Sequence, residues 1–303
     1  MKQKILFVTP HLSTGGAPQY LFKKIESLHS VFQIYCVEYS NLSDIFVVQK
    51  NRIKEVLGNR LTTLGENKYK LLEIISSIAP NIIHFEELPE SFVDPDIAVQ
   101  IYKTSRDYRL IETSHDSSIE PDNKKFFPDK FIFVSNYQEK KFKKLDIPSS
   151  VVEYPIVYHN RPDRKISLQK LGLNHTSKHF LHVGLFTSRK NQSEAIDYAR
   201  SLSHLPFEFH FVGNQADNFK AYWEPLMKGL PSNCRVWGER KDIENFYSSM
   251  DCFLFTSKGS EGDKETSPLV IREAIGWRMP VLIYNLDVYC GMYDEYSSVH
   301  YLG

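Results

Sequence analysis

The chain has 303 residues, of which 42% are hydrophobic and 24% are charged, and its Lys and Arg residues equal its Asp and Glu residues at 37 each. This composition is typical of a globular protein, and the length favours two domains. The net charge of zero argues against nucleic acid as the main partner, and no apolar run has the length of a membrane-spanning helix.

The N-terminal stretch Met-Lys-Gln-Lys-Ile-Leu-Phe-Val-Thr has too short an apolar part for a signal peptide and predicts a first strand instead. Four cysteines, Cys36, Cys234, Cys252 and Cys290, share no short metal-binding or redox spacing. We therefore expect buried thiols in a reducing compartment and a cytoplasmic protein.

Short apolar runs alternate with helical patterns through the first half of the chain. The predicted strands are Ile5–Val8, Gln33–Val37, Leu61–Leu64, Ile82–Phe85, Leu110–Thr113 and Phe131–Val134. Helices are predicted over Lys68–Ile78, Asp96–Thr104 and Asn136–Lys144. Continuous apolar strands alternating with helices are typical of a parallel sheet covered on both faces, so the prediction is a doubly wound α/β domain.

The periodicity fails around Tyr154–Asp163, where two prolines and several polar residues occur, and the domain boundary is placed there. The second half repeats the alternation. Its predicted strands are Phe180–Val183, Phe207–Val212, Arg235–Trp237, Cys252–Phe255 and Val281–Tyr284, and its predicted helices are Ser167–Leu171, Asn191–Leu202 and Ile243–Met250. The prediction is two Rossmann-like domains, residues 1–157 and 158–303, that face each other across a cleft.

One stretch, Glu265–Glu273, combines two carboxylates with a helix start. Ser267 fits an N-cap and Pro268 the first helical position, so the N–H groups of Leu269 and Val270 are predicted to form an anion site. Phosphate on N–H groups and hydroxyls on carboxylates is the pattern that a nucleotide sugar requires. The alternative interpretation is a capped surface helix with no ligand.

Several motifs follow predicted strands in a fixed order. They are Thr9-Pro-His-Leu-Ser-Thr-Gly-Gly16, Thr113-Ser-His-Asp116, Phe133-Val-Ser-Asn136, Val183-Gly-Leu-Phe-Thr-Ser-Arg-Lys-Asn191, Phe211-Val-Gly-Asn214, Trp237-Gly238 and the paired glutamates. In this order and spacing the chain resembles the retaining GT-B glycosyltransferases of family 4, also called glycosyltransferase group 1, over most of its length. The resemblance implies an N-terminal acceptor domain and a C-terminal domain that holds the nucleotide sugar.

The resemblance also implies donor-binding residues. The loop with Gly15 and Gly16 approaches the donor phosphates, and a cation at Lys190 stabilises the leaving diphosphate. Gly213 follows a second-domain strand and joins this set. Two positions depart from the family pattern: Leu185 stands where relatives have an Arg, which leaves Arg189 as the substitute, and Pro268 stands where a glycine is common. The alternatives are a tight turn at the glycines and a solvated Arg-Lys pair.

His115 follows a predicted strand, and an imidazole there can orient a sugar hydroxyl or relay a proton. By resemblance it lies near the primary hydroxyl of the donor sugar, and Glu265 lies nearer the reacting sugar than Glu273, which accepts hydrogen bonds from the ribose. The predicted catalytic residues are therefore His115 and Glu265. Candidates of lower rank for the acceptor side are His11, His84, Glu86 and Glu87.

The segment Lys124–Lys144 carries seven lysines, with Phe126, Phe127, Tyr137 and Phe142 among its aromatic residues. Such a segment could contact an anionic membrane or a lipid-diphosphate acceptor at the inner face of the membrane. Its acidic residues dilute the charge, so a solvated surface is the other interpretation.

The function predicted from these residues is transfer of a sugar from a nucleoside diphosphate donor to a glycan or lipid-linked acceptor, with retained configuration, in polysaccharide biosynthesis. We expect no cofactor and no metal. A divalent ion requires convergent carboxylates, such as an Asp-x-Asp motif at the end of a strand, whereas the match Asp94-Pro-Asp96 precedes a helix in an ordinary loop. The alternatives are a sugar-nucleotide epimerase and a non-catalytic partner subunit of the same fold. A dinucleotide-dependent oxidoreductase is disfavoured, since no Gly-x-Gly-x-x-Gly follows a strand. Relatives continue past the position of Gly303, so we expect a truncated or short chain.

Overall fold

The computed structural model describes residues 2–13, 15–40, 48–258 and 265–302. The chain divides into two compact units, Met1–Glu153 (unit 1) and Tyr154–Gly303 (unit 2). The division lies between residues 153 and 154, whereas the sequence led us to place it between 157 and 158. The segment from Tyr154 onward is bonded to unit 2: the Tyr154 carbonyl accepts from Arg272 Nη1 at 2.8 Å, and His159 N donates to the Gly276 carbonyl at 3.0 Å.

Unit 1 is built on a parallel sheet. Its strands are β1 (Lys4–Thr9), β2 (Gln33–Glu38), β3 (Leu61–Thr63), β4 (Ile82–Phe85), β5 (Arg109–Ser114), β6 (Lys130–Phe133) and β7 (Ser149–Val151). Within the described ranges these seven strands lie in the order β3-β2-β1-β4-β5-β6-β7, and every neighbouring pair is parallel.

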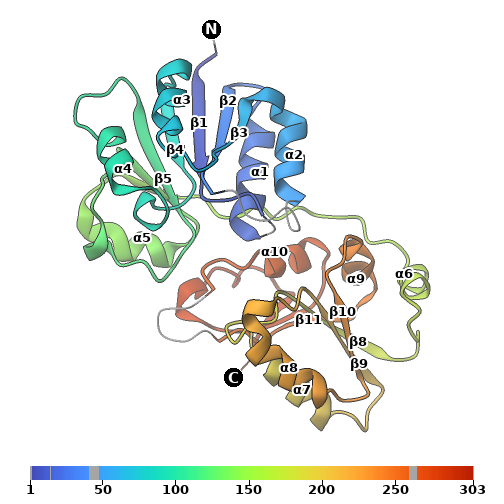
Figure 1. Ribbon diagram of the computed structural model, residues 1–303. Coiled ribbons are helices and arrows are strands. Elements are labelled where there is room, and N and C mark those ends of the chain that lie inside the picture. The colour runs from blue at the N-terminus through green and yellow to red at the C-terminus, as the bar shows by residue number, and fades with distance from the viewer. Residues whose placement is uncertain (1, 14, 41–47, 259–264, 303) are drawn as a thin grey trace. The chain divides into compact units, whose positions relative to one another are not determined.

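Helices cover both faces of this sheet (Figure 1). They are α1 (Gly16–Leu28), α2 (Val48–Leu57), α3 (Lys70–Ile78), α4 (Pro95–Ile101) and α5 (Asn136–Phe142). One buried cluster joins Leu21 and Ile25 of α1 to the strands, and another joins Leu71 of α3 and Ile97 of α4 to the opposite face. The central strands are buried on both faces, which explains why they are apolar throughout and do not alternate.

Unit 2 has a second parallel sheet. Its strands are β8 (Lys178–Val183), β9 (Phe207–Val212), β10 (Cys234–Gly238), β11 (Cys252–Phe255), β12 (Val281–Tyr284) and β13 (Val299–Leu302). In the part of unit 2 that the structure describes, these six strands lie in the order β10-β9-β8-β11-β12-β13 and pair in parallel.

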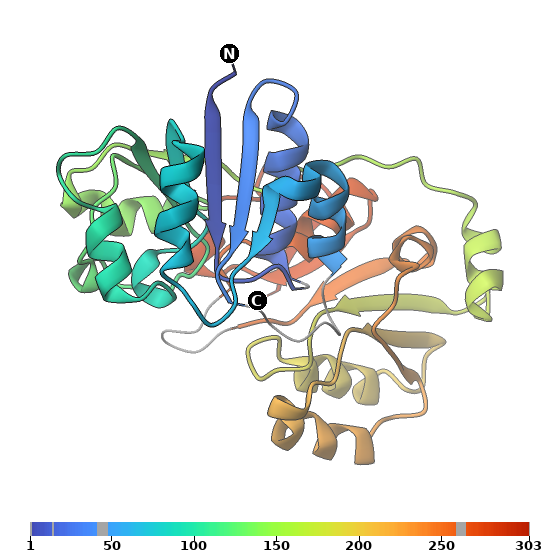
Figure 2. The same ribbon diagram turned by 45° about the horizontal axis from the view of Figure 1, so that its top comes forward.

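The helices of unit 2 also lie on both faces of their sheet, with α7 and α8 on one side and α9 and α10 on the other (Figures 1 and 2). They are α6 (Arg164–Leu171), α7 (Gln192–Ser201), α8 (Lys220–Lys228), α9 (Ile243–Ser249) and α10 (Leu269–Gly276). Ala195 and Ile196 of α7 pack with Phe209 and Phe211 of β9 in the core. The predicted fold class, two doubly wound parallel-sheet domains, is confirmed for each unit.

Two edge strands were missed by the sequence analysis, β7 and β13, and both have short or polar sequences, Ser-Ser-Val and Val-His-Tyr-Leu. Helix α6 begins three residues earlier than the predicted Ser167. The Asp163 side chain caps it by accepting from the N–H groups of Lys165 and Ile166, and apolar periodicity does not record such a cap.

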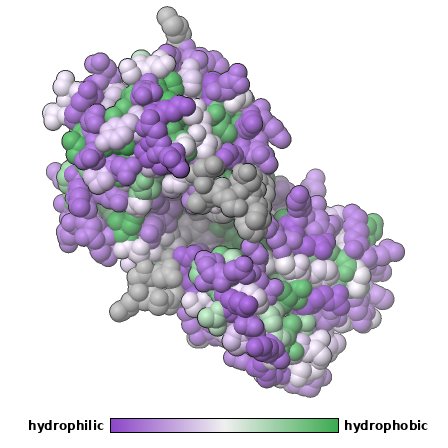
Figure 3. All heavy atoms as spheres, viewed as in Figure 1, coloured by the Kyte–Doolittle hydropathy of each residue, from purple (hydrophilic) through white to green (hydrophobic). Residues whose placement is uncertain are grey.

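The visible face of each unit is mainly hydrophilic, with hydrophobic residues in small separate groups (Figure 3). Exposed large apolar side chains such as Val31, Val99 and Ile166 belong to different helices and turns, which is ordinary for a folded surface. Among the described residues, the helices are all too short or too polar to cross a lipid bilayer.

Candidate functional site

Each sheet has one point where the strand order reverses. In unit 1 it lies between β1 and β4, and in unit 2 it lies between β8 and β11. In open parallel sheets the ligand binds beyond the carboxyl ends of the strands at this point. Most of the predicted site residues follow these strands: Gly15 and Gly16 lie beyond β1, Arg189 and Lys190 beyond β8, and Glu265 beyond β11.

Three predicted residues of unit 2 meet directly. Glu265 Oε1 lies 2.8 Å from Arg189 Nε and 2.9 Å from Lys190 Nζ, so two cations share one carboxylate oxygen. The Arg189 side chain is 40% exposed, against 15% for Lys190 and 11% for Glu265. Arg189 therefore lies beside Lys190 on the same partner. Its substitution for the arginine that Leu185 replaces stays a prediction. We call these three residues the donor-loop cluster.

The backbone of this loop is held by the end of β11. Ser257 Oγ donates to the Arg189 carbonyl at 2.7 Å, and Thr256 Oγ1 donates to the Asn191 carbonyl at 2.7 Å. Asn191 Nδ2 returns a bond to the Thr256 carbonyl at 3.1 Å. These bonds pair polar backbone groups of a loop that belongs to no strand, and they hold the backbone that carries the two cations.

Gly213 has a structural reason that does not require a ligand. A Cβ at this position would lie 2.0 Å from the Gly184 carbonyl oxygen, and its φ is +151°. Only glycine allows the ends of β8 and β9 to approach this closely. The structure leaves the predicted donor contact of Gly213 untested.

Helix α10 starts one residue later than expected. Pro268, with an extended ψ of 116°, occupies the N-cap position, and no side chain caps the helix. The prediction of Ser267 as the N-cap is therefore wrong: its hydroxyl lies 3.9 Å from Met292 Sδ. Ile271 N already bonds to the Pro268 carbonyl at 3.2 Å, so Leu269 and Val270 carry the first two N–H groups of the helix.

Glu273 lies in the second turn of α10, where it accepts a hydrogen bond from a buried tyrosine. Tyr247 Oη donates to Glu273 Oε2 at 2.7 Å. Burial, and then the charge of Glu273, raise the pKa of Tyr247 well above its usual range, so the hydroxyl keeps its proton and donates. Sequence analysis missed Tyr247, because nothing in Ile243–Ser249 distinguishes it from a core aromatic residue.

In unit 1, Gly15 is the N-cap of α1 and Gly16 is its first residue. Gly15 has a φ of +154°, a conformation that favours glycine, although no atom within 3.5 Å would oppose a Cβ there. Of the motif that contains these glycines, residue 14 lies outside the described residues.

His115 follows β5 and contacts a buried network of charged and polar side chains that includes Glu86 and Lys24. Its Nε2 is 3.6 Å from Glu86 Oε2, and its side chain is 8% exposed. Glu86 in turn accepts from Lys24 Nζ at 2.8 Å, and the same amine donates to Thr113 Oγ1 at 2.9 Å. Burial lowers the pKa of His115 although Glu86 opposes the shift, so the imidazole is neutral near pH 7.

The acceptor-side assignment of His84 and Glu86 is not supported by their burial. Their exposed fractions are 6% and 1%, because both lie inside this network, where His84 Nε2 is 2.8 Å from Thr113 Oγ1. Burial, and then Lys24, lower the pKa of His84 to about 3. Burial alone would raise the pKa of Glu86, but Lys24 and the two histidines bring it down to about 2. His11 and Glu87 are half-buried, and burial raises the pKa of Glu87 to about 8.

The basic segment 124–144 is more neutralised than its sequence indicates. Lys124 is buried, with its amine 2.8 Å from both Glu90 and Glu112, so it does not belong to a surface patch. Lys141 pairs with Glu120 at 2.7 Å and Lys144 pairs with Asp122 at 2.6 Å. A membrane contact of this segment stays a hypothesis, and fewer of its lysines are available for anionic lipids than the sequence indicates.

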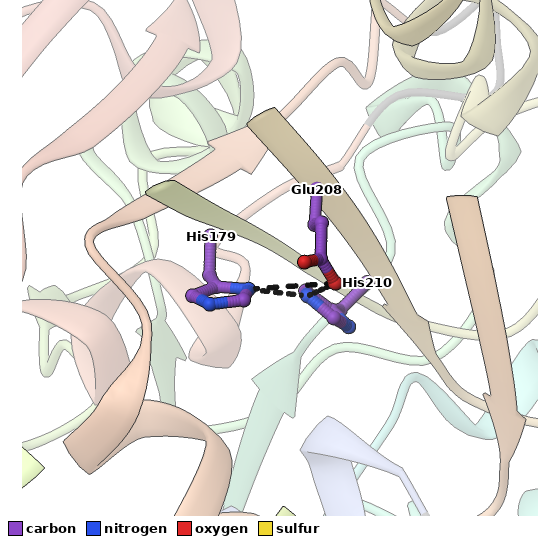
Figure 4. A group of neighbouring side chains, drawn as sticks. All are labelled: His179, Glu208 and His210. Atoms are coloured by element: carbon purple, nitrogen blue, oxygen red, sulfur yellow. Dashed lines mark hydrogen bonds and ion pairs between the residues drawn. The ribbon is translucent and has the colours of Figure 1, made fainter. Parts of the chain in front are cut away.

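One group of side chains in the described residues has a composition suited to a metal: His179 on β8 with Glu208 and His210 on β9 (Figure 4). His179 Nδ1 lies 2.9 Å from His210 Nε2, and Glu208 Oε2 is 3.9 Å from each of these nitrogens. His179 and Glu208 lie at the amino ends of their strands, away from the carboxyl ends where the donor-loop cluster lies.

Hydrogen bonds at the outer nitrogens decide the state of these rings. Trp237 Nε1 can only donate, so His210 Nδ1 at 3.1 Å is an acceptor and the proton of the neutral ring lies on Nε2. The carbonyl of Asn174, 2.7 Å from His179 Nε2, requires a proton there, which leaves His179 Nδ1 to accept from His210. Burial lowers the pKa of His210 to about 3, which agrees with a neutral ring. A metal would need a lone pair on His210 Nε2, so the residues present do not fit one.

Comparisons with known proteins bear on the fold and on the sequence pattern of unit 2. The family model of the group 1 glycosyl transferases matches residues 163–298, which is nearly all of unit 2. No curated protein has significant sequence similarity to the chain. Solved structures show the fold. HepE of Anabaena, in complex with UDP and glucose, has a TM-score of 0.71 at 17% identity over 92% of this chain and 80% of its own.

Two further structures are similar over almost the entire chain. A glycosyltransferase of Rickettsia africae has a TM-score of 0.74 at 16% identity, covering 99% of this chain and 84% of its own. WaaG, a glycosyltransferase involved in lipopolysaccharide biosynthesis, has a TM-score of 0.62 at 15% identity, covering 98% and 85%. The chain thus has the GT-B glycosyltransferase fold, and its second unit carries the sequence pattern of the group 1 glycosyl transferases.

Proposed function

We propose that this protein is a glycosyltransferase that moves a hexose from a nucleoside diphosphate donor to a glycan or lipid-linked acceptor in polysaccharide biosynthesis. The observation that carries the proposal is the donor-loop cluster, in which Arg189 and Lys190 share the Glu265 carboxylate at the carboxyl ends of β8 and β11. Two cations with one carboxylate leave positive charge for an anion, and the first N–H groups of α10 follow Glu265 by four residues.

The reaction that suits this arrangement breaks the bond between the sugar C1 and a phosphate oxygen. Negative charge then builds on the leaving diphosphate, where Arg189 and Lys190 and the N–H groups of Leu269 and Val270 stabilise it. The acceptor hydroxyl oxygen forms the new bond to C1, and its proton leaves with the diphosphate. The reaction involves no oxidation or reduction. Because Arg189 and Lys190 supply the positive charge that a divalent ion supplies in other sites, we propose that the transfer is independent of metal. Retention of configuration and membership of family 4 are part of the same proposal.

The remaining site residues have separate proposed roles. Glu273 accepts hydrogen bonds from the ribose, Glu265 lies beside the reacting sugar, and His115 orients a sugar hydroxyl. HepE of Anabaena is named as a complex with UDP and glucose, so we propose a uridine diphosphate sugar as the first donor to test. A neutral His115 suits a hydrogen-bonding role toward a sugar hydroxyl.

A donor screen followed by product analysis tests the proposal. Thermal shift with common nucleotide sugars should identify a donor that raises the melting temperature, without added magnesium and in the presence of a chelator. Release of nucleoside diphosphate should then depend on an added glycan or lipid-linked acceptor. An epimerised nucleotide sugar formed from the donor alone would instead identify an epimerase, and binding without turnover would identify a non-catalytic subunit.

A further inference from the structure

The hydrogen bond between Tyr247 and Glu273 joins a buried residue to a partly accessible one. Tyr247 is 1% exposed and its ring packs near Phe253, whereas Glu273 is half-buried on the second turn of α10. The tyrosine holds Oε2 at 2.7 Å. A glutamate side chain otherwise rotates among several conformers, and this bond selects one orientation of the carboxylate plane.

The two helices that carry this bond are held by one segment of unit 2. Arg161 Nε donates to the Ser248 carbonyl at 2.9 Å and its Nη2 to the Met250 carbonyl at 2.6 Å, which fixes the end of α9. His159 N donates to the Gly276 carbonyl at the end of α10. A Cβ on Gly276 would lie 2.2 Å from the Val157 carbonyl oxygen, so the segment packs tightly on that helix.

Because residues 157–161 fix both helices, the Tyr247 hydroxyl and the Glu273 carboxylate are already at bonding distance before any ligand arrives. A group that is oriented in advance loses less conformational freedom when it binds. Tyr247 is almost fully buried, so it can affect a bound nucleotide only through the Glu273 carboxylate.

We propose that Tyr247 is a positioning residue that orients the Glu273 carboxylate toward the ribose hydroxyls of the donor. The proposal rests on the proposed function, in which Glu273 accepts those hydroxyls. It predicts a defect that depends on the ligand: loss of the tyrosine hydroxyl should weaken binding of a nucleotide that has ribose hydroxyls and spare one that lacks them.

Isothermal titration of the full chain with UDP and with 2′,3′-dideoxy-UDP provides the test. In the parent, UDP should bind more tightly than the dideoxy nucleotide. Glu273→Gln should remove most of this preference. Tyr247→Phe should weaken UDP binding by about threefold to tenfold and change binding of the dideoxy nucleotide by less than about twofold. In the double variant, Tyr247→Phe should add little to Glu273→Gln, because the two residues act through one carboxylate.

Tyr102→Phe is the matched control, since Tyr102 Oη also donates to a carboxylate, Glu112 Oε1, at 2.6 Å but does so in unit 1. It should leave both affinities unchanged. If Tyr247→Phe weakens the two nucleotides equally, its role is structural and the positioning proposal is wrong. If the Glu273→Gln protein keeps the preference for UDP, then Glu273 does not bind the ribose hydroxyls, and that part of the proposed function is wrong. Absence of UDP binding by the parent would overturn the choice of a uridine donor and this inference with it.

Discussion

Unit 1 and unit 2 each contain a cluster of acidic and basic side chains, and the two clusters have opposite proportions. In unit 1 the single amine of Lys124 lies between the carboxylates of Glu90 and Glu112. In the donor-loop cluster of unit 2 the single carboxylate of Glu265 lies between Arg189 and Lys190. The side chains of Lys124 and Glu112 are at most 1% exposed, whereas Arg189 is 40% exposed.

The difference shows how each cluster can balance its charge. Burial raises the pKa of Glu112 to about 7 although Lys124 opposes the shift. The cluster of Lys124, Glu90 and Glu112 can therefore balance its excess negative charge by binding a proton on Glu112. A basic excess cannot be relieved in this way, because an arginine keeps its proton at any physiological pH. The donor-loop cluster is more accessible and lies at the switch point of its sheet, where an anion can supply the missing charge. The buried cluster is therefore expected to affect stability, and the accessible one binding.

The largest expected effect is on the stability of unit 1. Lys124→Met should lower the free energy of unfolding by about 3–5 kcal/mol, because it leaves the buried carboxylate of Glu112 without its cation. The loss should be smaller near pH 6 than near pH 8: Glu112 has a folded pKa of about 7, above its unfolded value, so its protonated form is favoured as the pH falls. Urea unfolding followed by circular dichroism measures the change.

Two controls locate this effect. Lys144→Met removes an exposed pair with Asp122 and should change stability by at most about 0.5 kcal/mol. Trp223, Trp237 and Trp277 all belong to unit 2, so tryptophan fluorescence reports the unfolding of that unit. A Lys124→Met protein as stable as the Lys144→Met protein would contradict a structural role for the buried cluster.

The next effect is on nucleotide affinity. Lys190→Ala and Arg189→Ala should each weaken binding of the nucleoside diphosphate by about 1.5–3 kcal/mol, with the larger loss for Lys190, which is the less exposed of the two. A chelator should leave the affinity unchanged. Lys178→Ala, at the amino end of the same strand β8, is the matched control and should bind as the parent does. Equal affinity in all variants, or loss of binding on chelation, would refute the cation assignment.

Replacement of the shared carboxylate should separate transfer from binding. Glu265→Gln removes a charge that competes with the diphosphate for Arg189 and Lys190, so nucleotide binding should stay intact or tighten. Transfer should slow about tenfold or more, the result of losing ~1.4 kcal/mol of transition-state stabilisation. Initial rates and titrations with the same donor measure both quantities. Transfer at the parental rate would show that Glu265 is only a partner of the two cations.

The smallest expected effect is that of a transition metal. Added zinc should not raise the melting temperature, because the Trp237 N–H group keeps the His210 lone pair on Nδ1, away from His179 and Glu208. Thermal shift with zinc and with a chelator measures this. A stabilisation by zinc that disappears in a His210→Asn protein would indicate a metal site at His179, Glu208 and His210.

The sequence alone determined the class of fold, and it pointed to the residues of the candidate site, whose roles stay predictions. Apolar runs such as Ile5–Val8 and Phe207–Val212 predicted buried parallel strands, because a strand covered on both faces is apolar throughout. Strand ends then located Lys190 and Glu265, since parallel strands bring their carboxyl ends to one edge of a sheet. Local rules placed the start of α10 less well, one residue from its observed position.

Only the tertiary structure decided which charges meet and which are buried. Lys124 resembles its neighbouring surface lysines in sequence, and Glu86 resembles Glu87, yet Lys124 and Glu86 lie in the interior with partners far along the chain. The same holds for Tyr247, whose partner Glu273 is on another helix. Periodicity reports whether a residue faces a core, but a hydrogen bond or an ion pair depends on positions set by the packing of several elements, and no local pattern records those positions.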